Sequence, residues 1–206
     1  GIRDVVLLVG YKYQQIKNYF DDGKRFGVNL TYILDRPEFK GSANALLNAY
    51  RLGAISRDDC LIAYYGDIIS NINLGELASQ HVESKAAATV ALARGFKIRV
   101  GTAEVRDGRI TRFIEKPELE SPVSIGVLAL NGGVLGEMGR LFEERRAGSF
   151  DLMGEFIPSL IERGHNVRAY VTSAFWYDLG SMERYERFEN DNLSGELAFL
   201  FEDQDP

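Results

Sequence analysis

The sequence has few of the features that form disulfides, span a membrane or bind nucleic acid. It has one cysteine, Cys60, so neither an internal disulfide nor a cysteine-rich metal cage can form. Its apolar runs, such as Val5 to Val9, are far shorter than the roughly 20 residues that a membrane-spanning helix needs. The net charge of −6, from 24 basic and 30 acidic residues, excludes binding to nucleic acid by charge alone. We therefore expect a soluble cytoplasmic protein without membrane or nucleic-acid partners.

Histidine is also scarce, which weakens a hydrolase interpretation. The sequence has two histidines, His81 and His165, and neither lies near a nucleophile motif. We expect both to lie at the surface. The segment that begins at Cys60 is apolar and strand-like, and it predicts a buried thiol.

The patterning that is present predicts an α/β fold. A chain of 206 residues with 45% apolar and 26% charged residues is typical of one globular domain. Strand-like runs alternate with helical spacing, which indicates a mostly parallel sheet covered on both faces, with ligands at the carboxyl ends of the strands. The expected strands cover residues 4–10, 28–34, 60–65, 86–93, 123–130 and 167–172, and the expected helices cover 13–20, 43–50, 74–82, 134–145, 150–163 and the residues after 181.

One segment departs from this alternation. Residues 100–105 and 109–114 flank Asp107-Gly108, a pair typical of a tight hairpin turn. The hairpin predicts a mixed sheet with a small extra lobe. We assign residues 1–193 to one domain and residues 194–206 to an acidic C-terminal tail.

Two aspartates are candidates for metal binding. Asp67 follows Gly66 at the end of the third expected strand, where glycine lets a ligand approach the backbone. Asp178 lies between aromatic residues and Gly180, and a carboxylate with apolar neighbours needs a cation or hydrogen bonds to compensate its charge. The alternatives are a solvated turn for Asp67 and a helix-start aspartate satisfied by backbone N–H groups for Asp178.

Two further segments are candidates for substrate binding. Glu115-Lys116-Pro117 brings an acid and a base to a stiff strand end, although an exposed ionic turn would have the same sequence. Gly41-Ser42 leads into a helix with small residues that leave room for a flat ring. The alternative there is an ordinary helix start with Ser42 as its cap.

In their order along the chain, these segments resemble the sugar-1-phosphate nucleotidylyltransferase family. The match covers about nine-tenths of the chain, and its strength lies in the order and spacing of the motifs. The matching segments are Val9-Gly10-Tyr11, Gly41-Ser42-Ala43, Gly66-Asp67, Val100-Gly101, Glu115-Lys116-Pro117, Gly126 and Trp176-Tyr177-Asp178-Leu179-Gly180.

The resemblance implies a Rossmann-like three-layer α/β/α fold with a small sugar-binding lobe. It also implies nucleotidyl transfer from a nucleoside triphosphate to a sugar 1-phosphate, which gives an NDP-sugar and pyrophosphate. Asp67 and Asp178 would share Mg²⁺, a hard ion that takes one or two carboxylates together with phosphate oxygens. Lys116 would contact the sugar phosphate. No general base is needed, because the attacking phosphate is already an anion.

The resemblance implies substrate contacts for the other motif residues as well. Glu115 would accept hydrogen bonds from sugar hydroxyls, and Gly41 and Ser42 would face the base. The remaining positions assigned to substrate binding are Gly66, Gly101, Ser124 and Gly126, of which Gly101 and Gly126 would line the sugar pocket through their backbone.

The chain also departs from the family's pattern. Ser124 stands where the family's Asn-Ala-Gly turn usually has Asn, and Asn44 stands where many members have Gly. The family's glycine-rich phosphate loop, with its Arg and a following Pro-Lys segment, precedes the strand at Val5 and is not in these 206 residues. We expect that loop upstream of Ile2, and we expect a chain that begins at Gly1 to form little NDP-sugar.

Two alternative functions remain open at this point. The scaffold could transfer a nucleotidyl group to a non-sugar phosphate such as phosphocholine, an option that Ser124 keeps open. It could also bind nucleotide sugars without chemistry. Assembly into a homo-oligomer is left open by the sequence.

Overall fold

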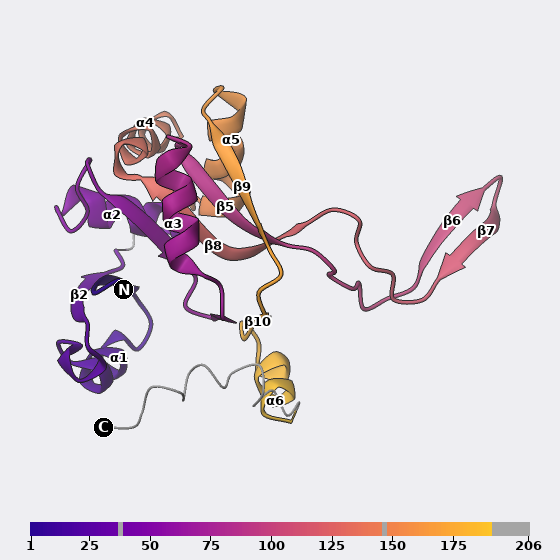
Figure 1. Cartoon of the computed structure of the whole chain (residues 1–206), viewed down its shortest axis with the longest axis horizontal. Coiled ribbons are helices and arrows are strands. Elements are labelled where there is room, and N and C mark those ends of the chain that lie inside the picture. Colours follow the sequence, from indigo (N-terminus) through magenta and orange to yellow (C-terminus); the bar gives the residue numbers. More distant parts are fainter. Residues whose placement is uncertain (37–38, 146–147, 191–206) are drawn as a thin grey trace. The chain divides into compact units, whose positions relative to one another are not determined.

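The structure is a computed structural model that describes residues 1–36, 39–145 and 148–190 (Figure 1). It is a mixed α/β fold with a mostly parallel central sheet, which confirms the predicted fold class. The tail predicted at residues 194–206 lies outside the described residues. Every helix among the described residues is too short or too polar to cross a membrane.

The elements follow the predicted alternation, with short additions. The strands are β1 (Asp4–Val9), β2 (Asn29–Leu34), β3 (Cys60–Tyr64), β4 (Ile68–Ser70), β5 (Ala88–Ala93), β6 (Thr102–Arg106), β7 (Arg109–Ile114), β8 (Val123–Asn131), β9 (Val167–Thr172) and β10 (Trp176–Asp178). The α-helices are α1 (Tyr13–Phe20), α2 (Ser42–Arg51), α3 (Leu74–Glu83), α4 (Leu135–Glu144), α5 (Ile157–Glu162) and α6 (Met182–Asn190). Strands β4 and β10 were not predicted, because three residues are too few to show a period.

Strands β1 and β2 form a parallel pair of their own, with Asp4 opposite Asn29 and Val9 opposite Leu34. The sequence of β1 predicts a strand buried on both faces, and this prediction is wrong for the described residues. Only Val9 is buried, whereas the four residues before it are half-buried. The apolar run is therefore only partly covered, and the helix that follows it, α1, has no buried residue.

The core lies in a four-stranded sheet with the order β3-β8-β5-β9. Most residues of β5 and the segment from Val127 to Leu130 in β8 are buried, as expected for small and β-branched side chains in covered strands. The chain divides into two compact units. The first comprises Gly1–Ile62, Ala78–Thr89 and Ala129–Arg168, and the second comprises Ala63–Leu77, Val90–Leu128 and the described residues from Ala169 to Asn190.

Two predictions about single side chains are wrong. His81 is buried, with 2% of its surface exposed, and its Nδ1 lies 2.9 Å from Oγ1 of Thr89. The helix α3 turns this side chain inward, where the threonine hydroxyl satisfies a ring nitrogen. Cys60, predicted to be buried, is exposed because it is the first residue of β3. His165 is exposed as predicted.

The helix predicted over residues 150–163 is divided. A π-helical turn covers Leu152–Phe156, and α5 then begins at Ile157 with Pro158 in its first turn. Proline has no N–H to donate to the carbonyl four residues earlier, so the hydrogen-bonding pattern changes at this point. The turn is capped by Asp151, whose carboxylate accepts the N–H of Gly154 at 2.6 Å.

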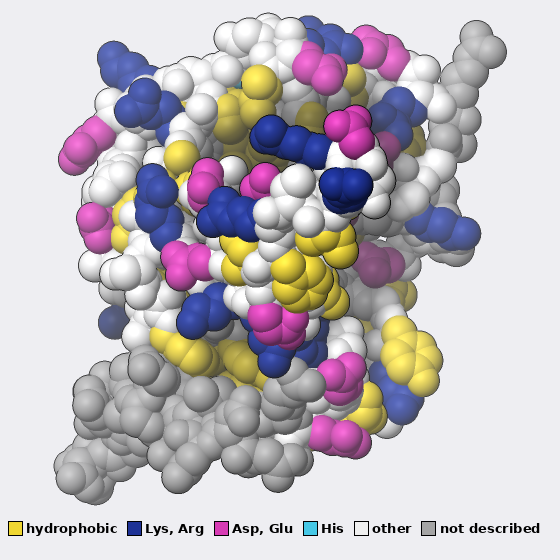
Figure 2. All heavy atoms as spheres, turned by 90° about the vertical axis from the view of Figure 1, so that its right-hand side faces the viewer, with side chains coloured by type: hydrophobic (Ala, Val, Ile, Leu, Met, Phe, Trp, Pro, Cys, Tyr) yellow, Lys and Arg dark blue, Asp and Glu magenta, His cyan; other side chains and the backbone are white. Residues whose placement is uncertain are grey.

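The predicted hairpin is confirmed as β6 and β7, which pair antiparallel (Figure 1). Its turn uses positive φ angles at Asp107 (49°) and Gly108 (75°), the signature of a two-residue hairpin turn. Ile110 and Phe113 are more than half exposed. Figure 2, seen from the hairpin side of Figure 1, shows hydrophobic side chains interspersed with basic and acidic ones.

Candidate active site

Two short strands in the second unit bring the candidate metal ligands together. Strand β10 pairs antiparallel with β4, and Asp178 lies opposite Ile68 in this register. Asp67 directly precedes β4, and its carbonyl oxygen accepts the N–H of Leu179 at 2.7 Å. Residues 111 positions apart in the sequence therefore become neighbours through backbone pairing.

Gly180 lies where both carboxylates converge. A methyl group built on its α-carbon would lie 2.9 Å from Oδ2 of Asp67 and 2.9 Å from Oδ1 of Asp178. The φ of Gly180 is not in the left-handed region, so glycine is needed here for space rather than for backbone conformation. The two carboxylates thus face a common space that a side chain at position 180 would fill.

This donor set fits Mg²⁺ rather than a metal enclosed by protein ligands. Mg²⁺ is commonly bound by one or two carboxylates and completes its octahedron with water and substrate phosphates. Among the described residues there is no group of three or more His, Cys, Asp or Glu side chains that could hold a metal ion. A site at Asp67 and Asp178 would therefore depend on phosphate ligands from the substrate.

Asp178 has partners on both carboxylate oxygens. Its Oδ1 accepts the N–H of Gly180 at 2.7 Å, and its Oδ2 is paired with the guanidinium of Arg184. Partial burial acts to raise the pKa of Asp178, but the Arg184 guanidinium and the Gly180 N–H outweigh this effect and hold the pKa below its usual value. The backbone hydrogen bond expected of a helix-start aspartate is thus present, and the ion pair is added to it.

Gly126 lies beside the loop that carries Asp67. It has a φ of 72°, and a methyl group there would lie 3.0 Å from Cγ1 of Ile68 and 3.4 Å from Cβ of Tyr65. Its carbonyl oxygen accepts the N–H of Tyr65 at 3.0 Å. The exposed Ser124 hydroxyl accepts the Gly126 N–H at 3.5 Å, and the exposed Gly66 has open space at its α-carbon. Close backbone approach here leaves little room for any residue except glycine at position 126.

Gly101 and Glu115 meet at the base of the β6–β7 hairpin. A methyl group on Gly101 would lie 2.5 Å from Cζ of Phe113 and 2.9 Å from Oε2 of Glu115. Lys116 is exposed and has a left-handed backbone with a φ of 49° directly before Pro117. This bend turns the chain sharply at the end of β7, and it departs from the extended conformation that a residue before proline ordinarily adopts.

The segment predicted to face the base lies in the first unit and is held by a second loop. Gly41 has a φ of 92°, and a methyl group there would lie 2.4 Å from the Phe150 carbonyl oxygen. Two backbone bonds join the segments, from the Phe150 N–H to the Lys40 carbonyl at 2.9 Å and from the Ala43 N–H to the Phe150 carbonyl at 3.0 Å. Gly41 is thus required by both its backbone conformation and this close approach.

Ser42 joins the same two segments through its side chain. Its hydroxyl donates to Oδ2 of Asp151 at 2.8 Å and accepts the N–H of Leu152 at 2.8 Å. The cap position of α2 belongs to Gly41, so Ser42 is not the cap that the alternative interpretation expects. Partial burial acts to raise the pKa of Asp151, but backbone N–H groups and the Ser42 hydroxyl hold it below its usual value.

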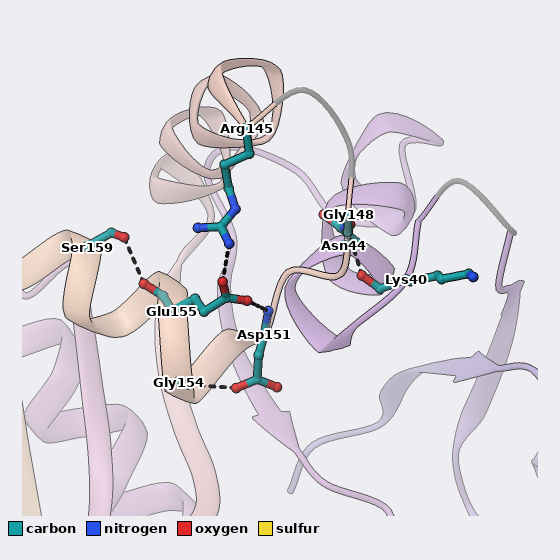
Figure 3. Close-up of polar contacts among 8 residues, drawn as sticks. All are labelled: Lys40, Asn44, Arg145, Gly148, Asp151, Gly154, Glu155 and Ser159. Carbon is teal, nitrogen blue, oxygen red and sulfur yellow. Dashed lines mark hydrogen bonds and ion pairs between the residues drawn. The ribbon is translucent and has the colours of Figure 1, made fainter.

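Figure 3 shows how the second loop is anchored in turn. The Asp151 N–H donates to Oε2 of Glu155 at 2.8 Å, and the other oxygen of Glu155 is paired with Arg145. The buried amide of Asn44 donates to the carbonyls of Lys40 and Gly148 at 2.7 and 3.1 Å. We call the bonds between residues 40–44 and 148–152 the loop clamp.

Sequence reasoning did not assign Gly180 a packing role, and it missed Arg184 and Asp151. Gly180 and Arg184 were visible only as a family motif position and a helix residue, and their roles depend on the unpredicted β4–β10 pair. Asp151 lies in a segment predicted as plain helix. The Asp-x-x-Gly spacing of a capped turn start at Asp151 and Gly154 was the one available signal.

Comparison with known proteins places the chain in a family. The family model described as "Nucleotidyl transferase" matches residues 1–195. A glucose-1-phosphate adenylyltransferase of Kocuria rhizophila is 25% identical over 90% of this chain and 53% of its own length. A D-glycero-alpha-D-manno-heptose 1-phosphate guanylyltransferase of Aneurinibacillus thermoaerophilus is 27% identical over 93% of this chain and 79% of its own.

The structural comparison agrees with the fold. The crystal structure of HddC from Yersinia pseudotuberculosis superposes with a TM-score of 0.64 at 16% identity, covering 91% of this chain and 77% of that one. The chain spans about half the length of several curated relatives that it matches, as in the 53% of the Kocuria protein. Because the family model covers nearly all of the sequence, the chain belongs to the nucleotidyl transferase family.

Proposed function

We propose that the protein transfers a nucleotidyl group from a nucleoside triphosphate to a sugar 1-phosphate, releasing pyrophosphate. The observation that carries this proposal is the convergence of the Asp67 and Asp178 carboxylates at Gly180. The names of the relatives, which are adenylyl- and guanylyltransferases of sugar 1-phosphates, support the same reaction class. The sugar and the base are left to experiment.

Asp67 and Asp178 would hold Mg²⁺ in this proposal. The ion would neutralise phosphate charge and stabilise the charge that develops during transfer, in a protein whose own net charge is −6. Asp67 is exposed and Asp178 is half-buried, so both can reach an ion that is also bound by substrate phosphates.

The chain's other residues would bind and orient the substrates. Lys116 would attract the sugar phosphate, and Glu115, next to Gly101, would accept hydrogen bonds from sugar hydroxyls. Gly126 would let the sugar approach the backbone beside the Asp67 loop. The phosphate of the acceptor is already a competent anionic nucleophile, so catalysis requires positioning and charge stabilisation rather than proton abstraction.

Gly41 would contribute to the base side of the site through the backbone. The Ser42 hydroxyl is occupied by Asp151 and Leu152, which supports a role in shaping this segment. The loop clamp would hold residues 40–44 in place, so that a planar base meets a preformed surface.

A substrate panel tests the proposal. The protein at its full natural length is incubated with Mg²⁺, each of the common nucleoside triphosphates and a set of sugar 1-phosphates, and both pyrophosphate and NDP-sugar are measured. We expect one or a few combinations to give both products in equal amounts. Asp67→Asn should lower the rate by about 100-fold or more, because a charged metal ligand is lost.

The control is Asp58→Asn, which removes the same charge from an exposed loop of the first unit and should leave the rate unchanged. Phosphocholine is included as an acceptor. If phosphocholine is the one acceptor that gives product, the acceptor in this proposal is a non-sugar phosphate rather than a sugar 1-phosphate. Tight binding of an NDP-sugar, with no product from any combination and no dependence on Asp67, would contradict transfer and indicate a binding module.

A further inference from the structure

We propose that Arg184 is a built-in counter-ion of Asp178 that competes with the metal and sets the metal affinity of the site. This inference rests on the proposed function, because it concerns the same carboxylate pair. Its basis is the contact between the Arg184 guanidinium and Oδ2 of Asp178. An arginine remains charged at any pH at which the protein is folded, so this contact is a permanent cation at a candidate metal ligand.

Arg184 is fixed in this place by its own backbone. Its N–H donates to Oγ of Ser181 at 3.3 Å, which caps the start of α6. Its carbonyl oxygen accepts the hydroxyl of Tyr177 at 3.1 Å. The residue is therefore held to both sides of the Asp178-Leu179-Gly180 turn, and its side chain reaches the carboxylate across one turn of the chain.

Each carboxylate oxygen of Asp178 already has a hydrogen-bond donor, so a metal ion has to compete for it. The Gly180 N–H occupies Oδ1 and the guanidinium occupies Oδ2, so both oxygens are engaged before a metal arrives. An ion bound between Asp67 and Asp178 must share Oδ1 or Oδ2 with the donor already bound there, or displace that donor. In either case the positive charge of Arg184 repels the cation.

The expected size of the effect follows from exposure. The side chains of Arg184 and Asp178 are 43% and 34% exposed, so water weakens the pair. Ion pairs at this level of exposure change equilibria by about two- to fivefold. Arg184 would therefore lower the affinity for free metal by this factor and favour metal that arrives with phosphate charge already bound.

The test measures metal binding directly, without turnover. Trp176 is the chain's one tryptophan and lies on β10 two residues before Asp178, so it can sensitise the luminescence of Tb³⁺ bound nearby. Tb³⁺ is a hard cation with the same preference for oxygen ligands as Mg²⁺. Titration with Tb³⁺ gives its dissociation constant, and displacement by Mg²⁺ gives the affinity for Mg²⁺.

Arg184→Gln should bind Tb³⁺ and Mg²⁺ about two- to fivefold more tightly than the wild type, whereas Arg184→Lys, which keeps the charge, should stay close to the wild type. Arg112→Gln is the matched control, because it removes one charge of an exposed ion pair with Glu104 on the hairpin. Circular dichroism confirms that each variant is folded.

Asp67→Asn and Asp178→Asn separate the two hypotheses. If either substitution leaves the Tb³⁺ signal intact, the carboxylates do not form the metal site and the proposed function loses its basis. If both substitutions abolish the signal but Arg184→Gln binds metal with unchanged or lower affinity, the metal site stands and the role of Arg184 is refuted.

Discussion

At the scale of single residues, the candidate site depends on the absence of a side chain at position 180. The two aspartates approach each other only because nothing fills the space between them. The positions that would be crowded by a methyl group at Gly180 are the carboxylate oxygens themselves, at 2.9 Å each. Gly180 is therefore as much a part of the site as the charged residues.

Substitution of Gly180 by alanine tests this role. The added methyl should push the carboxylates apart and weaken Tb³⁺ and Mg²⁺ binding by about tenfold or more, because productive ligand geometry tolerates shifts of only about 0.5 Å. The backbone angle at Gly180 suits alanine, so stability should change little. Gly136→Ala is the control, since its methyl would meet open space on α4. Equal metal binding by Gly180→Ala and wild type would contradict the convergence.

The buried His81 predicts a pH dependence of stability. Burial lowers the pKa of its imidazole below the usual value, so the folded state holds it neutral where the unfolded state is already protonated. Its contribution is present above a pH of about 6.5, the unfolded value, and is lost as the pH falls below it. Urea unfolding at a series of pH values should show this decline, and His81→Asn should flatten it. His165→Gln, at an exposed position, should leave the decline as it is.

At the scale of elements, two short features hold the candidate site residues. The β4–β10 pair brings Asp67 and Asp178 together, and the loop clamp fixes residues 40–44. Alternation of strands and helices predicted most of the longer elements, because each has enough residues to show a period. The three-residue strands β4 and β10 carry no period, so the juxtaposition of Asp67 and Asp178 was available only through family resemblance. The burial of single residues was harder to predict than the elements. The predictions for β1, Cys60 and His81 were wrong because burial depends on neighbours that the whole folded chain supplies.

The loop clamp predicts an effect on nucleotide binding that is separate from metal binding. Ser42→Ala removes the bond to Asp151 and leaves the Leu152 N–H without its acceptor, which should lower the free energy of unfolding by about 1 to 2 kcal/mol. If the clamp shapes the base side, the KM for nucleoside triphosphate should rise while metal binding stays unchanged. Ser159→Ala is the control, because that hydroxyl bonds within its own helical turn, to the Glu155 carbonyl. A raised KM in the control as well would show that stability alone governs the effect.

At the scale of the whole molecule, family membership and the carboxylate pair support one another. The family match covers residues 1–195, and the two candidate metal ligands come from segments far apart in the sequence that the β4–β10 pair brings together. The proposed substrate groups are distributed over both units, with Gly41 in the first and Asp67, Glu115 and Asp178 in the second. The joint action of Asp67 and Asp178 in one metal-dependent reaction is the central claim of the proposal.

A double-substitution cycle on the two aspartates tests that claim most directly. The rate of NDP-sugar formation, as kcat/KM, is measured for Asp67→Asn, Asp178→Asn and the double variant at saturating Mg²⁺. When two residues act as one unit, removing either one abolishes the contribution of both. We therefore predict that the double variant is no slower than the slower single variant. Losses that multiply, or a single variant with the rate of the wild type, would show that Asp67 and Asp178 do not share one metal-dependent site.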